Sequence, residues 1–422
     1  MNKMSMDNMV PEIRFEGFST NWLNFNLSQI TDVYDGTHQT PAYTKSGVMF
    51  LSAENIKSLT STKFISEEAF KKEFKVYPKK NDVLMTRIGD VGTANVVETD
   101  DDRAYYVTLA LLKYKKISPY FLKSSIASPF VQKDIWLRTL HIAFPKKINM
   151  NEIKKVAVNC PPDVVESDKI GQYFKNLDAL INQHQQKHDK LSNIKKAMLE
   201  KMFPKPGKTI PEIRFKGFSG EWEEMPFGAC FINVSNNTLS RADLNYDDGM
   251  AKNIHYGDVL IKFGEVLDAT NELLPFITNN DVANKLKHAA LRDGDIIIAD
   301  AAEDSMVGKC TELFNIGEQL VLSGLHTIAV RPTLTFASKY LGYYLNSSSY
   351  HDQLLSLMQG TKVLSISRTA IQNTNIVFPK SAEEQVEIGN YFQKLDALIN
   401  QHQQQITKLN NIKQACLSKM FI

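Results

Sequence analysis

Asp163 to Phe203 has the sequence DVVESDKIGQYFKNLDALINQHQQKHDKLSNIKKAMLEKMF, and Ser381 to Phe421 has the sequence SAEEQVEIGNYFQKLDALINQHQQQITKLNNIKQACLSKMF. The two segments align without a gap, each residue of the second lying 218 positions after its partner. About two-thirds of the positions from Ile170 onward are identical. The chain therefore contains an internal repeat, and its fold has to be derived from the repeated unit.

Each segment is predicted to be one long amphipathic helix. Asp163 and Ser381 are residue types that cap helix N-termini, and Glu166 and Glu384 follow at the capping-box spacing. Pro204 cannot continue a helix interior, so the first helix should end before it. A helix of this length spans roughly 60 Å at 1.5 Å per residue.

Apolar residues in both segments recur at steps of four and three, which is typical of a coiled-coil seam. We expect the two helices to pack antiparallel, with a seam formed by Phe174, Leu177, Ile181, Leu191, Phe392, Leu395, Ile399 and Leu409. His184 and His188 have a spacing that can hold a metal, but Ile406 occupies the position of His188 in the second copy. Packing in the seam is therefore favoured, and no metal site is predicted.

A second repeat opens each half of the chain. Pro11 to Phe18 is PEIRFEGF and Pro211 to Phe218 is PEIRFKGF, and a tryptophan follows each. The sequence thus divides into a domain over 1–162, a helix over 163–203, a linker over 204–210, a domain over 211–380 and a helix over 381–422. We predict an α+β fold of two pseudo-symmetric repeats, each a mostly β domain followed by a long helix.

Short β-type runs and turn residues fill the two domains, and a helical stretch precedes each final extended run. The predicted strands are Val48–Leu51, Asp82–Thr86, Ala94–Val97, Tyr105–Leu109, Asp258–Ile261, Asp295–Ile298 and Thr327–Val330. The predicted helical stretches are Pro119–Trp136 and Ser338–Met358. The two domains differ strongly in sequence although the helices that follow them are nearly identical, which favours one function performed on two different targets.

The composition is that of a soluble globular protein with two to four domains: 422 residues, 43% hydrophobic, 23% charged and a net charge of +2. The first twelve residues, MNKMSMDNMVPE, contain no apolar run, and no later run is long enough to span a membrane. Four scattered cysteines indicate neither a zinc site nor disulfides. We expect a cytoplasmic protein.

Enzyme motifs are nearly absent. The sequence contains no GxxxxGK[ST], GxSxG or HExxH. Asn159-Cys160-Pro161-Pro162 resembles the Asn-Pro-Pro-aromatic motif of amino methyltransferases only superficially, because the cysteine interrupts it and no aromatic residue follows. A self-contained nuclease or methyltransferase is therefore the weakest hypothesis.

A lysine cluster, Lys71, Lys72, Lys75, Lys79 and Lys80, precedes Arg87 and the glycine-rich turn that follows it. Most lysine runs are solvated surface. Aromatic residues are interleaved here, however, and glycines in the turn would let backbone amides approach phosphates. Both the solvated face and a DNA contact remain open on these residues alone.

Several stretches together resemble the specificity subunit of type I restriction–modification enzymes. They are the doubled LDALINQHQQ core with Phe378-Pro379 and Glu383-Glu384-Gln385 before it, Asp35 to Tyr43 (DGTHQTPAY), Asp82 to Gly89 (DVLMTRIG), Ile254 to Asp258 (IHYGD) and Ser323 to Thr327 (SGLHT). The first copy departs from this pattern at its entry turn, where Cys160 to Asp163 (CPPD) stands in place of Phe378 to Ser381 (FPKS).

The resemblance implies a non-catalytic DNA-recognition protein that binds no cofactor itself. Two target-recognition domains would bind the halves of an asymmetric DNA site, and the paired helices would set the unread gap. The implied partners are two modification subunits carrying S-adenosylmethionine, and restriction subunits using ATP and Mg²⁺. The alternative is a coiled-coil scaffold that binds proteins and never DNA.

Side chains for DNA contact are chosen from these stretches and from lysines and arginines elsewhere in the two domains, because base edges are recognised by polar side chains and phosphates by lysine and arginine. The candidates in the first domain are Thr37, His38, Thr40, Tyr43, Lys80 and Arg87. Those in the second domain are Arg241, His255, Lys262, His326 and Lys362.

Overall fold

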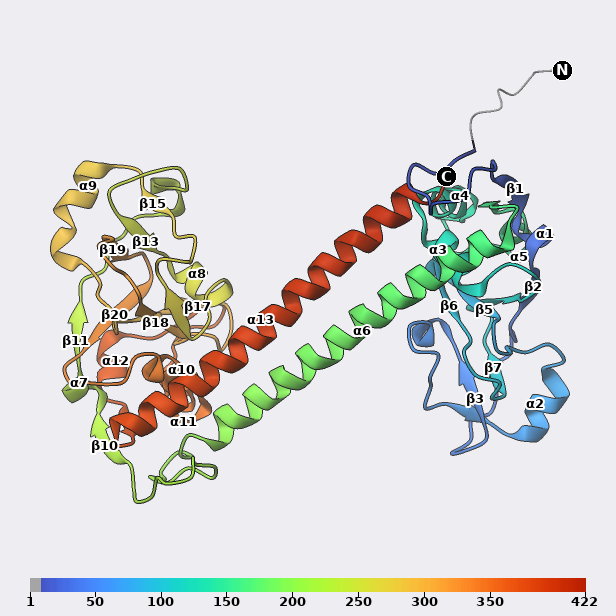
Figure 1. Ribbon diagram of the computed structural model, residues 1–422. Helices are drawn as coiled ribbons and strands as arrows, with labels where there is room; N and C mark the ends of the chain where they lie inside the picture. Colours follow the sequence, from blue (N-terminus) through green and yellow to red (C-terminus); the bar gives the residue numbers. More distant parts are fainter. Residues whose placement is uncertain (1–8) are drawn as a thin grey trace. The chain divides into compact units, whose positions relative to one another are not determined.

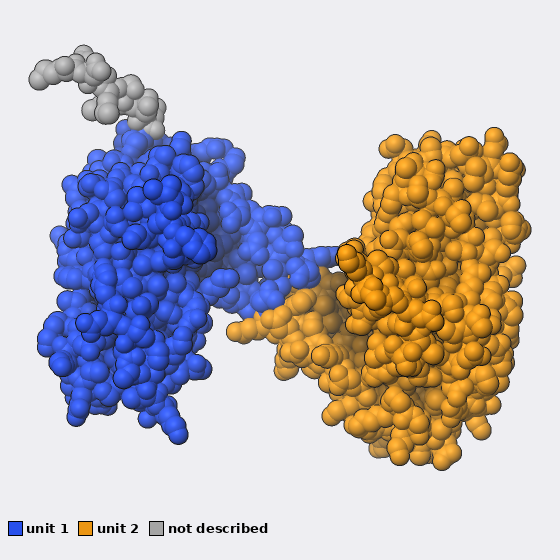
Figure 2. Space-filling model, turned by 180° about the vertical axis from the view of Figure 1, so that it is seen from behind, with its two compact units in different colours: residues 1–185, 403–422 blue, residues 186–402 orange. Residues whose placement is uncertain are grey.

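The computed structural model describes residues 9–422, which form two compact units (Figures 1 and 2). Of the described residues, unit 1 consists of residues 9–185 and Gln403–Ile422, and unit 2 consists of Gln186–His402. The long helix α6 (Val164–Lys201) begins in unit 1 and ends in unit 2, and α13 (Ala382–Lys419) does the reverse. Each unit therefore contains its own mostly β domain, the start of its own long helix and the end of the other one.

Unit 1 is built on a four-stranded antiparallel sheet in the order β2-β8-β5-β6 and a three-stranded sheet in the order β4-β3-β7. Its strands are β1 Leu23–Asn26, β2 Asp32–Asp35, β3 Val48–Leu51, β4 Phe64–Ile65, β5 Val83–Ile88, β6 Asp90–Val96, β7 Arg103–Tyr105, β8 Leu109–Lys113 and β9 Ala157–Cys160. Its helices are α1 Leu27–Ile30, η1 Ala53–Asn55, α2 Glu67–Glu73, α3 Pro119–Ala127, α4 Pro129–Arg138 and α5 Met150–Lys154. A short β1–β9 pair closes the domain just before α6.

Unit 2 repeats this plan with a five-stranded sheet, β11-β20-β16-β18-β14, and a four-stranded sheet, β12-β15-β13-β19. Its strands are β10 Glu223–Pro226, β11 Phe231–Val234, β12 Leu244–Asn245, β13 Lys252–Ile254, β14 Val266–Asp268, β15 Phe276–Ile277, β16 Ile296–Ala299, β17 Ala301–Ala302, β18 Cys310–Phe314, β19 Val321–Ser323, β20 Thr327–Pro332, β21 Leu364–Ser365 and β22 Asn375–Phe378. Its helices are α7 Phe227–Cys230, η2 Arg241–Asp243, α8 Tyr256–Ile261, α9 Asn280–Lys285, η3 Lys287–Ala289, α10 Tyr340–Asn346, α11 Ser348–Leu355 and α12 Arg368–Gln372.

A buried aspartate opens the central strand of each unit. Asp82, before β5, accepts a hydrogen bond from the backbone N–H of Lys79 at 2.7 Å and pairs with Lys113 at 2.5 Å. Asp295, before β16, accepts a hydrogen bond from the backbone N–H of Arg292 at 2.8 Å and pairs with Arg331 at 2.7 Å. A buried carboxylate needs such partners, and the same set occurs twice. The two domains therefore share one framework.

The helix starts were predicted correctly, but the role of the glutamates in the first turn was not. Asp163 accepts from the N–H of Val165 at 2.8 Å, so it does cap α6. The carboxylate of Glu166, however, is buried against the Arg14 guanidinium at 2.6 and 2.7 Å and does not complete a capping box. Unit 2 repeats the arrangement with Arg214 and Glu384. The arginine of each PEIRF motif thus binds the start of its domain to the first turn of the long helix that follows.

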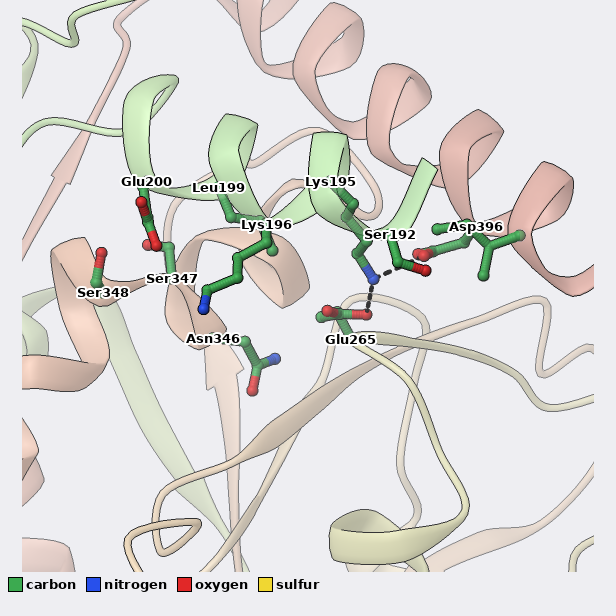
Figure 3. Close-up of a pocket in the computed structure, with 11 residues that line it drawn as sticks. Ser192, Lys195, Lys196, Leu199, Glu200, Glu265, Asn346, Ser347, Ser348 and Asp396 are labelled. Carbon is green, nitrogen blue, oxygen red and sulfur yellow. Dashed lines mark hydrogen bonds and ion pairs between the residues drawn. The ribbon is translucent and has the colours of Figure 1, made fainter. Parts of the chain in front are cut away.

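Within each unit the two long helices pack antiparallel, as predicted. In unit 1, Asp178 of α6 pairs with Lys413 of α13 at 2.7 Å. In unit 2, Lys195 of α6 pairs with Asp396 of α13 at 2.6 Å and with Glu265 at 2.8 Å (Figure 3). Because the sequence repeat relates Asp178 to Asp396 and Lys195 to Lys413, the two helix-to-helix pairs are copies of one pair.

The predicted seam residues are all at least half-buried on these helices. Phe174, Leu177, Phe392 and Leu395 are buried, whereas Ile181, Leu191, Ile399 and Leu409 are half-buried. In unit 1, Phe174 lies 5.7 Å from Phe421, measured between ring centroids. In unit 2, Phe392 stacks on Phe203 at 5.8 Å. The aromatic residues therefore join each helix start to the end of the antiparallel helix.

Two predicted strands are wrong. Asp258–Ile261 forms the main part of helix α8, not a strand. The side chain of His255 caps this helix by accepting from the N–H of Gly257 at 3.2 Å. Val259 is buried on one face and Ile261 is exposed on the other, so the apolar run is amphipathic at helical spacing. The Tyr105–Leu109 run is also not one strand, because it is the turn between β7 and β8 and only its two end residues belong to those strands. The other predicted strands and both helical stretches occur.

Candidate nucleic-acid interface

In unit 1, three of the predicted residues meet around Asp35, at the end of β2. The Nε2 atom of His38 lies 2.9 Å from one carboxylate oxygen of Asp35, and Nη1 of Arg87 lies 2.9 Å from the other. Thr37 is held beside them, because its N–H donates to the carbonyl of Tyr105 and its carbonyl accepts from Val107. Thr37, His38 and Arg87 therefore form one cluster at one end of the sheet.

Arg87 occupies the interior of this cluster, with only 6% of its surface exposed. Its guanidinium also donates to the carbonyl of Val107 at 2.8 Å and to that of Ile148 at 3.4 Å. These bonds join the loop after β2, the loop before β8 and the segment before α5. The arrangement favours a positioning role for Arg87, while the exposed ring of His38 faces solvent.

The remaining candidates of unit 1 lie outside this cluster. Thr40 is exposed on the loop between β2 and β3. Tyr43 is 47% exposed, and its ring packs edge-on against Phe50 at 5.7 Å. Lys80 is exposed, but it precedes β5 whereas Arg87 lies near the end of that strand. The strand from Val83 to Arg87 is about 13 Å long at about 3.3 Å per residue, so Lys80 and Arg87 lie at opposite ends of β5.

A hairpin that sequence reasoning missed adjoins Arg87. Leu140 and Lys147 pair across it, with the N–H of Leu140 donating to the carbonyl of Lys147 at 2.7 Å. The N–H of Gly89 donates to the carbonyl of Lys146 at 2.9 Å, so this amide of the glycine turn is already bonded. The signal was the segment LHIAFPKKI, an apolar run ending in two lysines that has no helical period.

In unit 2, Arg241, His255 and His326 come together around α8. Arg241 pairs with the buried Asp258 at 2.8 Å. The ring of Tyr256 lies between the two histidines, 4.6 Å from His255 and 5.3 Å from His326 by ring centroids. These residues come from three separate segments, namely the start of η2, the start of α8 and the turn before β20, and the IHYGD and SGLHT motifs supply all but the arginine.

His255 and His326 differ in their surroundings. Burial, and next the positive charge of Arg241, lower the pKa of His255, which leaves its imidazole neutral at neutral pH. His326 has a left-handed backbone (φ 54°), and Nδ1 lies 3.2 Å from the Asp300 carboxylate. His326 is the more exposed of the two, so it is the one available to a ligand.

Lys262 and Lys362 lie apart from those three residues. The ammonium group of Lys262 bonds to the Leu273 carbonyl and lies 3.5 Å from Glu272. Lys362 is exposed on a hairpin closed by Gln359 and Ser365, and Ile366 beyond it donates to the carbonyl of Asp300 at 2.9 Å. Lys362 thus lies on the counterpart of the Leu140–Lys147 hairpin.

The same edge of each domain therefore carries different chemistry. The N–H of Ile148 donates to the Arg87 carbonyl at 3.0 Å in unit 1, and Ile366 donates to Asp300 at 2.9 Å in unit 2. Arg87 and Asp300 are consequently equivalent positions at the ends of equivalent strands. Unit 1 therefore carries the cation of Arg87 at this position and unit 2 carries the anion of Asp300, although the two domains share the surrounding framework.

The chain was compared with known proteins. Residues 232–411 match the family model described as the type I restriction modification DNA specificity domain. The match begins in β11 and ends in α13, so this part of the chain is similar to that specificity domain. The structure is similar to the type I S subunit of M. genitalium, with a TM-score of 0.61 and 14% identity over 98% of this chain and 99% of that one. That similarity concerns the fold.

Two further solved structures align over most of the chain. One, described as a structural basis for complex assembly and conformational transition of the type I R-M system, has a TM-score of 0.49 and 15% identity over 94% of this chain and 96% of that one. The other is the HsdS subunit of Thermoanaerobacter tengcongensis, with a TM-score of 0.41 and 16% identity over 95% and 96%. Among curated proteins, no sequence matches significantly.

The described part of the chain offers neither a membrane-crossing helix nor a metal cluster. Within residues 9–422, no helix combines the length and apolar character needed to cross a bilayer. The same residues contain no group of three or more His, Cys, Asp or Glu side chains placed to hold a metal ion. His188, half of the histidine pair noted in the sequence, lies 3.1 Å from Asp189.

Proposed function

We propose that this chain is the DNA sequence-recognition subunit of a type I restriction–modification complex, and that each unit recognises one half of a bipartite, asymmetric site. The observation that carries this proposal is the duplicated framework with different side chains at the same edge. The buried Arg87 positions the loops of unit 1, whereas Asp300 stands at the equivalent position of unit 2 beside the exposed His326. Two unlike recognition surfaces on one plan suit two unlike half-sites, whereas identical surfaces would suit a palindrome.

We further propose that the paired helices set the gap between the half-sites and carry the partner subunits. Both helices pass from one unit to the other, so a change in their length alters both ends of the connection. Modification subunits supplying S-adenosylmethionine and restriction subunits using ATP and Mg²⁺ would perform the chemistry. Residues 1–162 and 211–380 would act as the recognition domains, 163–203 and 381–422 as the spacer and 204–210 as the linker.

The test is a map of methylated adenines in cells that carry the complete system. Exchange of residues 25–150 for the corresponding segment of another specificity subunit should change one half-site and leave the other unchanged. A matched exchange within residues 225–365 should change only the second half-site. If both exchanges leave the methylated sequence unaltered, the chain does not select the DNA target.

The spacer is tested by lengthening both helices by four residues, after Gln183 and after the equivalent Gln401. Each helix gains about 6 Å at 1.5 Å per residue. The unread gap should grow by about one or two base pairs, since the rise per base pair is about 3.4 Å. The protein-scaffold alternative predicts instead that the purified complex shows no salt-dependent binding to duplex DNA.

A further inference from the structure

The hairpin from Leu140 to Lys147 presents large apolar side chains to solvent. Ile142 is 99% exposed and Phe144 is fully exposed, more than any other large apolar residue described. Single exposed apolar residues are ordinary on protein surfaces, but two at one tip mark a place of contact. The question is what they contact.

The root of the hairpin is fixed to the candidate interface of unit 1. Lys146 accepts a backbone hydrogen bond from Gly89 at 2.9 Å, and Ile148 donates to the carbonyl of Arg87 at 3.0 Å. Arg87 in turn binds Asp35, the residue that holds His38. The tip therefore projects from the same end of the sheet as the exposed His38 ring, and its direction is set by main-chain bonds.

Charge around the tip favours a polyanion. His141, Lys146 and Lys147 flank the apolar pair and are exposed, and residues 139–148 contain no carboxylate. An apolar surface for docking a protein usually lies among neutral residues with a mixed polar rim. Apolar side chains flanked within their own hairpin by two exposed lysines match a nucleic acid, whose phosphates take the cations while its base stack takes the apolar groups.

The counterpart in unit 2 shows that this tip varies while its root is retained. Gln359 and Ser365 pair across that hairpin at 2.8 and 2.9 Å, and Ile366 donates to Asp300 as Ile148 does to Arg87. Its tip is Gly360 to Leu364, with Lys362 exposed and Val363 55% exposed. A root kept in both domains and a tip that differs between them are expected of an element that distinguishes two half-sites.

We propose, on the basis of the function proposed above, that the hairpin of unit 1 enters a groove of the first DNA half-site. There Phe144, supported by Ile142, wedges between two stacked base pairs. Lys146 and Lys147 bind the flanking phosphates. Wedge insertion partly unstacks the step and bends the duplex, so steps that unstack readily are preferred at that position. The hairpin then contributes to specificity without a hydrogen bond to a base.

The test uses the complex of this chain with its modification subunits and duplexes carrying the methylated sequence mapped in cells. Each duplex has 2-aminopurine, which brightens when it is unstacked, at one position of the first half-site. Wild type should brighten the probe at one step. Phe144→Ala should abolish this signal and weaken binding about tenfold, or about 1.4 kcal/mol, without changing the salt dependence.

Three variants serve as controls. Phe144→Trp should retain the signal, because a larger ring can still occupy the step. Lys146→Ala with Lys147→Ala should keep the signal but reduce the salt slope by about 0.9 for each phosphate that is no longer bound. Val363→Ala, at the equivalent tip of unit 2, should leave the first half-site signal unchanged.

Two results would overturn the inference alone: wild-type binding with no brightening at any position of the half-site, or a Phe144→Ala complex that still brightens the same step. Loss of the modification subunits from Phe144→Ala would assign the tip to a protein contact and equally overturn it. A wild-type complex that binds no duplex would instead reject the proposed function itself. Because Phe144 is fully exposed, its substitution does not disturb the core.

Discussion

Replacement of Arg87 by methionine separates two roles that this residue could have in DNA recognition. The sequence suggested a phosphate contact, whereas the structure places the guanidinium inside the domain, between Asp35 and the carbonyls of Val107 and Ile148. Removing one partner of a buried ion pair costs about 3–5 kcal/mol. Asp35 is partly exposed and also meets His38, so we expect a smaller loss, about 2–3 kcal/mol.

That loss should fall on the loops of the candidate interface in unit 1, which Arg87 joins. Binding to the first half-site should weaken by about tenfold to a hundredfold, since each 1.4 kcal/mol corresponds to a factor of ten. The slope of log affinity against log salt should not change, because no phosphate contact is removed. Arg87→Lys should recover part of the affinity, since one ammonium group can reach Asp35 but not both carbonyls.

The assay is a DNA-binding titration at four salt concentrations, together with hydrogen exchange of peptides covering residues 105–110 and 140–150. Lys147→Met, which removes an exposed cation from the neighbouring hairpin, is the matched comparison and should reduce the slope by about 0.9. If Arg87→Met reduces the slope by the same amount and leaves hydrogen exchange unchanged, Arg87 is a phosphate ligand and the positioning role is refuted.

Three further predictions concern stability, each measured by hydrogen exchange resolved by unit. Arg14→Met should lower the free energy of unfolding of unit 1 by about 3 kcal/mol, and Arg214→Met should lower that of unit 2 by about 4 kcal/mol. The difference arises because Trp22 still donates to Glu166 after the arginine is removed, whereas Trp222 makes no such bond in unit 2. Lys195→Met should lower the free energy of unfolding of unit 2 by about 3 kcal/mol, because it removes the lysine that pairs with both Glu265 and Asp396. The equivalent Lys413→Met should lower that of unit 1 by only about 1 kcal/mol, because Asp178 still pairs with Lys123. Burial raises the pKa of Glu312 to about 7, so the folded state holds this proton more tightly than the unfolded chain does. The free energy of unfolding of unit 2 should therefore fall as pH rises from about 4.5 to 7, and Glu312→Gln should flatten this pH dependence. Equal losses within either pair of equivalent variants, or a pH dependence unchanged by Glu312→Gln, would contradict these assignments.

Sequence reasoning located the long helices, their antiparallel packing and most strands because these depend on periodicity and repetition. Asp163 and Ser381 were identified as caps from residue type alone, and both act as caps. The glutamates three residues later were misassigned, because their arginine partners lie more than 150 residues away in the sequence. A local pattern contains no information about such a partner.

The candidate site was predicted less completely for the same reason. The motifs around His38 and His326 were found because they are short and distinctive. The burial of Arg87 could have been inferred, since it continues the face of β5 that carries the buried Val83 and Met85. The LHIAFPKKI segment could have been recognised as non-helical, but its place beside Arg87 could not have been inferred, because that depends on backbone hydrogen bonds between distant segments.

The two units share their buried ion pairs but differ at their hairpin tips, and this difference has a physical origin. Asp82 and Asp295 are buried with their cations, so a change at either leaves an unpaired charge in the interior, and both units retain the same arrangement. A side chain at a hairpin tip is solvated whatever its type, so its replacement costs the fold little. Phe144 in one unit and Lys362 in the other can thus differ freely. Changes of target should therefore accumulate at the strand ends and hairpin tips, while the buried pairs that orient them stay fixed.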